Sequence, residues 1–293
     1  MRGCRLCPRE CGADRENQKG ACGCGKNPFV ARAALHMWEE PCISGSNGSG
    51  AIFFCGCNLK CVFCQNHEIS RKEAGREFDS DDVAELMLRM QDLGAHNVNL
   101  VTPSVHALTL VKSIDKAKGN GLKIPVVYNT NAYEKTETLR LFKGLVDIYL
   151  PDLKYVSSTV SCKYSSAADY FSFAAPAVME MFDQCGPLKL SEDGIAQKGL
   201  IIRHLVLPGS VDETRKVLDF IASNLPLNTA ISLMSQYTPV FDDLPAPLNR
   251  KLTAREYDRA VDHCITLGLD NVLIQTGGCC EKTFIPEFNG YYE

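Results

Sequence analysis

Seven short apolar runs, each followed by a more polar segment, organise the chain after residue 50. They are nearly continuous in apolar residues, as strands buried on both faces of a sheet should be. The runs span residues 51–54, 97–101, 124–128, 146–150, 200–207, 230–234 and 271–275. Strands that alternate with helical segments predict a parallel sheet with right-handed crossovers.

The clearest helix is predicted over residues 80–94. Its apolar side chains recur at helical spacing and share one face. They are Val83, Leu86, Met87, Met90 and Leu93. Asp79 or Ser80 can cap the start of this helix, and Gly94 can end it.

Further helix starts are predicted at SVDE (210–213) and TARE (253–256), which both have the capping-box pattern. Residues 157–198 break the alternation and predict an extra helix and a long loop. Residues 1–50 are rich in Cys, Gly, Pro and Asn and end in the flexible stretch ISGSNGSG. We therefore expect an irregular N-terminal segment, residues 1–50, and one large domain, residues 51–293.

Six or seven strand–helix units are too few for a closed eight-stranded barrel but enough for an open one. The predicted fold is α/β: an open, partial parallel (β/α) barrel with a small Cys-rich N-terminal segment. In such folds the chemistry lies at the C-terminal ends of the strands. Four cysteines follow directly on the first predicted strand, in CGCNLKCVFC (55–64).

Composition narrows the possible partners and compartments. The net charge is −4 without a long basic block, so nucleic acid is a poor candidate partner. The first residues lack the apolar core of a signal peptide, and no run of about 18 apolar residues predicts a membrane span. We expect a cytoplasmic protein with no membrane partner.

Fifteen cysteines, ten of them in the first 64 residues, form an uneven distribution. A disulfide framework is not expected in the cytoplasm, and cysteines used only for packing should be scattered along the chain. The clustering therefore favours metal binding.

Cys57, Cys61 and Cys64 form a C-x3-C-x2-C pattern. Thiolates are soft ligands that suit iron, and three of them leave one iron of a [4Fe–4S] cube open for a small molecule. A zinc site is the alternative, with Cys55 or His67 as a fourth ligand, and plain packing is another. Cys55 alternates with Cys57 along a strand, so we interpret it as a neighbour of the cluster.

This spacing after a first strand, together with Phe63 beside the third cysteine, resembles the radical S-adenosylmethionine (SAM) superfamily. The resemblance implies an oxidoreductase whose open iron is chelated by the amino and carboxylate groups of S-adenosylmethionine. The reduced cluster would cleave the sulfonium and give a 5′-deoxyadenosyl radical. It also implies a low-potential electron donor such as flavodoxin or ferredoxin.

Two later stretches resemble glycyl-radical-enzyme activating enzymes. In VDIYLPDLKY (146–155), Asp152 and Lys154 would lie near the ribose and carboxylate of S-adenosylmethionine; a surface ion pair is the alternative. In YNTNAY (128–133), Asn131 keeps the family pattern and would contact the cofactor, although Asn129 and Ala132 depart from it.

Two further positions bear on the cofactor. IIRHLVLPGSVDE (201–213) resembles the fifth-strand region, where His204 is either a cofactor contact or a hydrogen-bonded core histidine. The superfamily commonly has a G-G-E segment after the second strand, but here Thr102, Pro103 and Ser104 occupy it. Backbone carbonyls near Thr102 would then bind the amine without an acidic partner.

The chain as a whole resembles the subfamily labelled pyruvate formate-lyase activating enzyme-like. That resemblance implies hydrogen-atom abstraction from a glycine of a partner protein. A small molecule or another protein side chain is the alternative substrate. An iron–sulfur electron carrier or a zinc-stabilised binding module is the alternative of another class.

The N-terminal cysteines form a second candidate metal site. Cys4, Cys7 and Cys11, together with Cys22 or Cys24, lie in a segment too small for a core of its own. A metal bound by these thiolates would stabilise it. Zinc, an auxiliary iron–sulfur cluster and simple packing remain open.

Several residues near the predicted site have no settled role. Trp38 should pack its segment against the barrel. Glu39 and Glu40 are either solvated charges or, like His36, face the active site. Gln236 and Tyr237 either line the pocket or pack in a loop, and Cys279 and Cys280 are either ligands or free thiols.

Overall fold

The computed structural model describes residues 3–71, 74–275, 286, 288 and 290–293. Its centre is one sheet with the strand order β10-β9-β8-β6-β5-β4-β2-β1-β3, and β7 pairs with β8 at the side. The strands are β1 Phe29–His36, β2 Ser49–Phe54, β3 Arg76–Glu77, β4 Val98–Val101, β5 Val126–Thr130, β6 Ile148–Pro151, β7 Lys189–Leu190, β8 Ala196–Leu205, β9 Ala230–Met234 and β10 Val272–Ile274.

All seven predicted strands are present, as β2, β4, β5, β6, β8, β9 and β10, and neighbours among them run parallel. Within the described residues no pairing joins β10 to β3, so the sheet is curved but open. The predicted α/β class and open barrel are confirmed.

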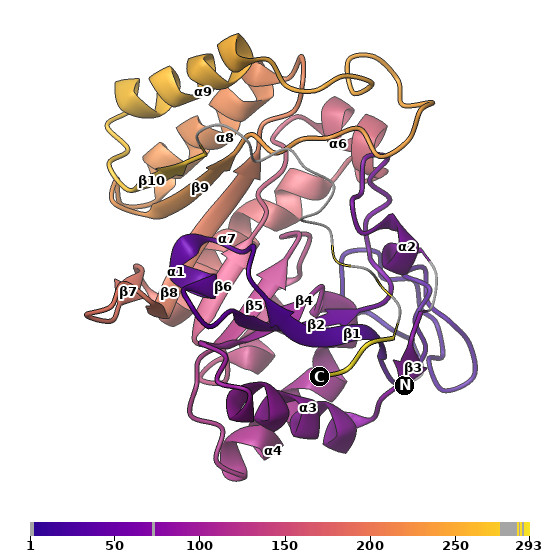
Figure 1. Ribbon diagram of the computed structural model, residues 1–293. Helices are drawn as coiled ribbons and strands as arrows, with labels where there is room; N and C mark the ends of the chain where they lie inside the picture. The colour runs from indigo at the N-terminus through magenta and orange to yellow at the C-terminus, as the bar shows by residue number, and fades with distance from the viewer. Residues whose placement is uncertain (1–2, 72–73, 276–285, 287, 289) are drawn as a thin grey trace.

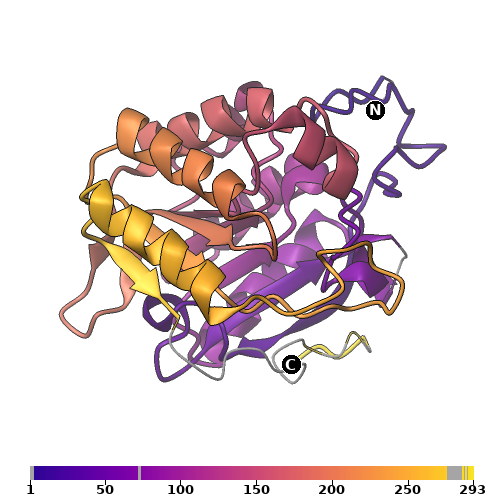
Figure 2. The same ribbon diagram turned by 90° about the horizontal axis from the view of Figure 1, so that it is seen from above.

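Helices cover the convex side of this sheet (Figures 1 and 2). The longer ones are α3 Ser80–Asp92, α4 Ala107–Gly119, α6 Ser158–Ser165, α7 Tyr170–Cys185, α8 Val211–Asn224 and α9 Ala254–Thr266. The short ones are α1 Pro41–Ser44, α2 His67–Ser70 and α5 Thr136–Leu139, with 3-10 turns at Ser104–His106 and Arg140–Phe142. No described helix combines the length and apolar character needed to cross a bilayer.

Side chains on each strand alternate between a helix-covered face and a concave face. Tyr128 and Tyr149 lie on the helix-covered face, where they pack in the main core. Val127, Ile148 and Ile201 lie on the concave face, in a separate small cluster. This alternation decides which later residues of the same strands face the concave side.

Two predictions about irregular segments are wrong. Residues 29–36 form β1, which pairs antiparallel with β2 although the surrounding composition suggested no regular structure. Residues 157–198 contain two helices, α6 and α7, and the short strand β7, in place of one helix and a long loop. The division at residue 50 stays a prediction, but β1 is a strand of the same sheet as β2.

The N-terminal loops before β1 stand at one end of the molecule and contain no helix or strand over the described residues 3–28 (Figure 2). There the prediction of irregular structure is confirmed. Figure 1 shows the C-terminal residues beside β1, which agrees with hydrogen bonds of Ala33 N to Tyr291 O (3.0 Å) and of Glu293 N to Ala33 O (2.9 Å).

The predicted caps have different outcomes. Asp79 caps α3 through a capping box with Asp82, and Thr253 caps α9 through one with Glu256. Ser210 makes no side-chain cap on α8. Glu213 instead accepts from the backbone N–H groups of Val156 (2.6 Å) and Ser157 (2.5 Å), so the predicted box at 210–213 is wrong.

Thr253 and Ser210 allow a matched test of capping. Thr253→Ala should lower the free energy of unfolding by about 1 kcal/mol, because the first turn of α9 loses its acceptor. Ser210→Ala should change it by less than about 0.5 kcal/mol, since no cap is lost. Urea unfolding followed by circular dichroism measures both, and equal losses would contradict the assigned caps.

Candidate active site

A cavity of about 630 Å³ opens at the C-terminal ends of the parallel strands. Its lining includes the three C-x3-C-x2-C cysteines, and Phe63, Thr102, Asn131, Asp152 and Lys154 from the predicted cofactor contacts. The structure therefore brings together residues from four separate loops, which follow β2, β4, β5 and β6. This is the edge at which parallel α/β folds carry their chemistry.

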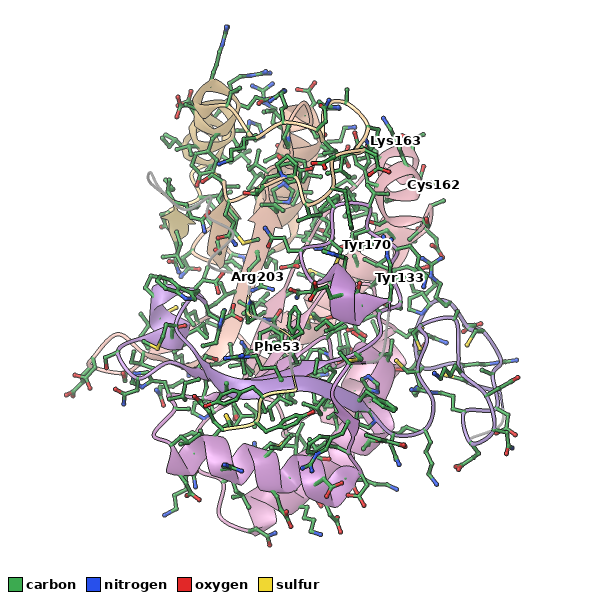
Figure 3. All side chains as sticks on the ribbon, turned by 45° about the vertical axis from the view of Figure 1, so that its right-hand side comes forward. Phe53, Tyr133, Cys162, Lys163, Tyr170 and Arg203 are labelled. Carbon is green, nitrogen blue, oxygen red and sulfur yellow. The ribbon has the colours of Figure 1, made fainter. Side chains whose placement is uncertain are left out.

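Strand alternation explains how the polar lining arises. On the concave face of β5, Val127 is followed by Asn129 and then Asn131, and on β6 Leu150 is followed by Asp152. β8 continues from Ile201 to Arg203 on the same face. Apolar residues thus seal the bottom of the barrel, and polar residues appear only where the strands end. Figure 3 shows Arg203 and Phe53 in the interior of the molecule.

The three cysteines each have a polar neighbour. Asn131 Nδ2 donates to Cys57 Sγ (3.3 Å), and the Ser165 hydroxyl lies 3.0 Å from Cys61 Sγ. Cys64 Sγ lies 3.6 Å from the Ser70 hydroxyl. Such contacts are suited to orienting and stabilising thiolates that bind a metal.

The thiols also fit a cluster by their chemistry. Burial raises the pKa of Cys57 to about 12, so a positive partner is needed before this thiol ionises. A cluster supplies that charge, and its binding releases the thiol protons. Three thiols that line one cavity suit a [4Fe–4S] cluster, in which three protein ligands leave one iron open.

Cys55 lies outside the cavity lining. Its thiol donates to Ala74 O (3.3 Å) within a small apolar cluster formed by Phe53, Ile69 and their neighbours. His67 Nδ1 lies 3.1 Å from Cys64 O, and its ring packs against Phe241. Neither side chain lines the cavity with the three cysteines.

A chain of charges crosses the floor of the cavity. Asp152 binds Lys154 (2.8 Å) and Arg203 (2.7 Å), and Arg203 also binds Glu39 (3.0 Å). Burial opposes ionisation of Asp152, but the two cations outweigh it and hold its pKa below the ordinary value. Asp152 and Lys154 are therefore a cavity pair and not a surface ion pair. Asn129 Oδ1 accepts a further bond from Arg203 Nη2 (2.6 Å).

The segment before α1 supplies further cavity residues. Glu39 lines the cavity and accepts from Asn99 Nδ2 (2.9 Å). His36 also lines it, and burial lowers the pKa of His36 to about 4. Glu40 is no solvated charge, because burial raises its pKa. Trp38 is 60% exposed and lines the cavity, so the prediction that it packs this segment against the barrel is wrong.

His204 is not a cavity residue. Its ring nitrogens lie 2.7 Å from Leu153 O and 2.9 Å from the Thr214 hydroxyl, beneath α8. Burial lowers the pKa of His204 to about 4, so the ring is neutral. The cofactor-contact interpretation is therefore wrong, because His204 follows the concave-face residue Arg203 and must point to the other face.

Thr102 has a strained backbone at the predicted cofactor position. Its φ of +64° is rare for a β-branched residue. A hydrogen bond from Thr102 N to Asn129 O on β5 (2.9 Å) keeps the backbone in this conformation. Strain of this kind concentrates at functional sites.

The remaining candidates from the sequence lie in different places. Gln236 lines the cavity, whereas Tyr237 is buried and donates its hydroxyl to Leu248 O (2.6 Å) while packing against Phe63. Cys279 and Cys280 lie outside the described residues.

Sequence reasoning missed two supporting residues. The hydroxyl of Tyr170 lies 2.9 Å from Asn131 O and 2.8 Å from Asp152 O, so α7 ties together the loops that follow β5 and β6 (Figure 3). Glu134 is fully buried and accepts from Thr130 Oγ1 (2.5 Å) and the Ser104 hydroxyl. Neither residue lies in a recognisable motif, because each acts through contacts with distant loops.

Comparison with known proteins agrees with this geometry. Residues 51–166 match the family described as the Radical SAM superfamily. The chain is 32% identical over 281 residues to the uncharacterized protein MJ0674 of Methanocaldococcus jannaschii, covering 92% of this chain and 76% of the relative. The chain belongs to the radical SAM superfamily.

Solved structures show the same fold at low identity. Streptococcus suis SuiB bound to precursor peptide SuiA has a TM-score of 0.52 at 15% identity, covering 74% of this chain and 46% of SuiB. SuiB bound to S-adenosylmethionine has a TM-score of 0.50 at 18% identity, covering 76% and 48%. The chain thus spans about half the length of these structures. Superfamily membership implies an enzyme with a [4Fe–4S] cluster and S-adenosylmethionine.

The burial of Glu134 predicts that the stability of the protein depends on pH. Burial raises its pKa to about 7 from an ordinary 4.5. Because the folded state holds this proton more tightly than the unfolded state, stability should fall as pH rises from about 5 to about 8, by about 3 kcal/mol. Anaerobic urea unfolding across this range measures the effect.

Glu134→Gln should remove that part of the pH dependence, since an amide does not ionise. Glu137→Gln, an exposed neighbour on α5, should keep it. A Glu134→Gln protein with the wild-type pH profile would show that Glu134 titrates normally.

Proposed function

We propose that this radical SAM enzyme abstracts a hydrogen atom from a glycine of a partner protein. The observation that carries the proposal is one cavity that unites the three cysteines with Asn131, Asp152 and Lys154 and opens beside an apolar rim. At this rim Met37 is 45% exposed and Trp38 is 60% exposed. Exposed apolar side chains beside a cavity favour docking of a polypeptide.

In this proposal, Cys57, Cys61 and Cys64 hold the [4Fe–4S] cluster, and the polar wall holds S-adenosylmethionine. When bound, the two cofactors supply one-electron cleavage of a sulfonium and hence a hydrogen-abstracting carbon radical. The protein binds, orients and excludes water around that chemistry. Phe63, which is buried against Tyr237, forms part of the apolar wall.

Lys154 and Asp152 carry the charges that their proposed contacts with S-adenosylmethionine require. Burial opposes the charge on Lys154, but Asp152 and Cys61 outweigh it and hold the pKa of Lys154 above the ordinary value. The ammonium is therefore available for a carboxylate, which we assign to S-adenosylmethionine. Asp152, fixed by Arg203, is the proposed ribose partner. A low-potential donor of the flavodoxin or ferredoxin class would supply the electron.

A small-molecule substrate remains the second candidate, because about 630 Å³ lies within the range of metabolite pockets. SuiB, whose fold this chain shares, binds a precursor peptide. That observation favours a polypeptide substrate over a small molecule. The two candidates differ in whether radical formation requires a partner protein.

The first experiment tests the reaction class. Anaerobically reconstituted protein, reduced with dithionite, should form 5′-deoxyadenosine from S-adenosylmethionine, and Cys61→Ala should form none. A candidate glycyl-radical enzyme added to the wild type should then show a glycyl signal in electron paramagnetic resonance (EPR). Cleavage without that signal for any candidate partner would reject the glycine substrate. A full, reducible cluster without cleavage, with or without a partner, would favour an electron carrier.

The second experiment tests cofactor placement without turnover. Lys154→Met should weaken equilibrium binding of S-adenosylmethionine by about 10- to 100-fold, since a charge-assisted hydrogen bond is lost. Lys163→Met is the matched control, because Lys163 projects from the outer surface of α6 (Figure 3). Anaerobic titration calorimetry on cluster-loaded protein measures both, and equal affinities would remove Lys154 from the binding site.

A further inference from the structure

We propose that Cys4, Cys7, Cys11 and Cys22 hold a second iron–sulfur cluster directly beside the catalytic one. The sequence left zinc, a cluster and packing open, and did not distinguish Cys22 from Cys24. The structure adds observations on the grouping of the thiols, on two arginines beside them and on the contact with the loop of Cys57.

The four thiols gather although no helix or strand joins them. Cys7 interacts electrostatically with both Cys4 and Cys22. A Cβ placed on Gly20 would lie 3.2 Å from Cys11 Sγ and 3.5 Å from Cys22 Sγ, so these sulfurs approach one point. Gly20 therefore leaves the room in which the two thiols meet.

Cys24 lies on the far side of Cys22. Its thiol donates to Cys55 O (3.3 Å) and lies 3.7 Å from His106 Nε2. The Cys24 thiol thus points toward Cys55 and His106, whereas the Cys22 and Cys11 sulfurs both lie beside Gly20. Cys22 is thus the fourth ligand, and Cys24 is a thiol behind it.

Two arginines, each with a buried nitrogen that lacks a partner, point to a missing negative charge. Arg9 and Arg15 each have a buried Nη2 with no hydrogen-bond partner among the described residues. Arg9 donates from Nε to Asn58 O (2.8 Å), and Arg15 donates to Gly25 O (2.7 Å) and acts electrostatically on Cys22. A buried charged donor without a partner is costly. Four thiolates around a cluster carry net negative charge and would accept these N–H groups.

The position of the four thiols favours a cluster over zinc in this proposal. Four thiolates can hold either one zinc ion or an iron–sulfur cluster. These four directly adjoin the loop of Cys57, Cys61 and Cys64, which we propose to hold the catalytic cluster.

The two ligand loops touch through their backbones. Cys57 N donates to Cys22 O (3.3 Å). Gly56 has φ +84°, and a Cβ there would lie 2.0 Å from Cys24 Sγ and 2.9 Å from Cys22 O. Only glycine allows this approach, which places the second cluster next to the first.

Iron analysis of a variant without the catalytic ligands tests the proposal. The Cys57→Ala/Cys61→Ala/Cys64→Ala protein, reconstituted anaerobically, should retain about four iron and four sulfide per chain and a reduced-cluster EPR signal. One zinc and no iron would overturn the cluster, and no metal at all would overturn the site. This readout is independent of S-adenosylmethionine cleavage and of any substrate.

Two single substitutions in that background identify the ligand. Cys22→Ser should lose the iron and the signal, whereas Cys24→Ser should keep both. Equal loss, or loss only in Cys24→Ser, would overturn the assignment of Cys22.

The wild type gives a test that needs no substitution. It should bind about eight iron, and its reduced EPR spectrum should show coupling between two neighbouring clusters. About four iron and an uncoupled spectrum would contradict the proposal even if the variants failed to fold.

Discussion

Alternation of side chains across the parallel strands is the constraint on which this active site depends. Every strand must fill a helix-covered core with one set of residues, and only the other set is free to face the cavity. On β8 this assigns Arg203 to the cavity and His204 to the core. The same alternation places Asn129 and Asp152, from neighbouring strands, on one polar wall of the cavity.

That polar wall is stabilised before any cofactor binds. Arg203 bridges Asp152 and Glu39, which come from segments more than a hundred residues apart, and Tyr170 ties the loops that carry Asn131 and Asp152. Preorganised charges require little rearrangement when a charged ligand arrives. Their mutual pairing offsets part of the cost of burying these ions.

The N-terminal loops are tied to the domain that carries the cavity. They contact the catalytic loop through Cys22 and reach α5 through Thr138 Oγ1, which donates to Leu6 O (2.7 Å). A segment with so little regular structure needs such tethers or a metal to remain ordered. Its hydrogen bonds supply tethers of this kind, and the metal is our proposal.

The sequence by itself determined the strand series, the open barrel and the three-cysteine motif, because local periodicity and short spacing specify these features. It also placed Asp152, Lys154 and Asn131 correctly at strand ends. Tertiary structure alone decided the rest. β1 is a strand because β2 offers it a partner, Trp38 is exposed because the cavity opens beneath it, and Glu134 and Tyr170 act through contacts that no local pattern encodes. Pairing, burial and charge compensation depend on residues far apart in the chain, and only folding brings them together.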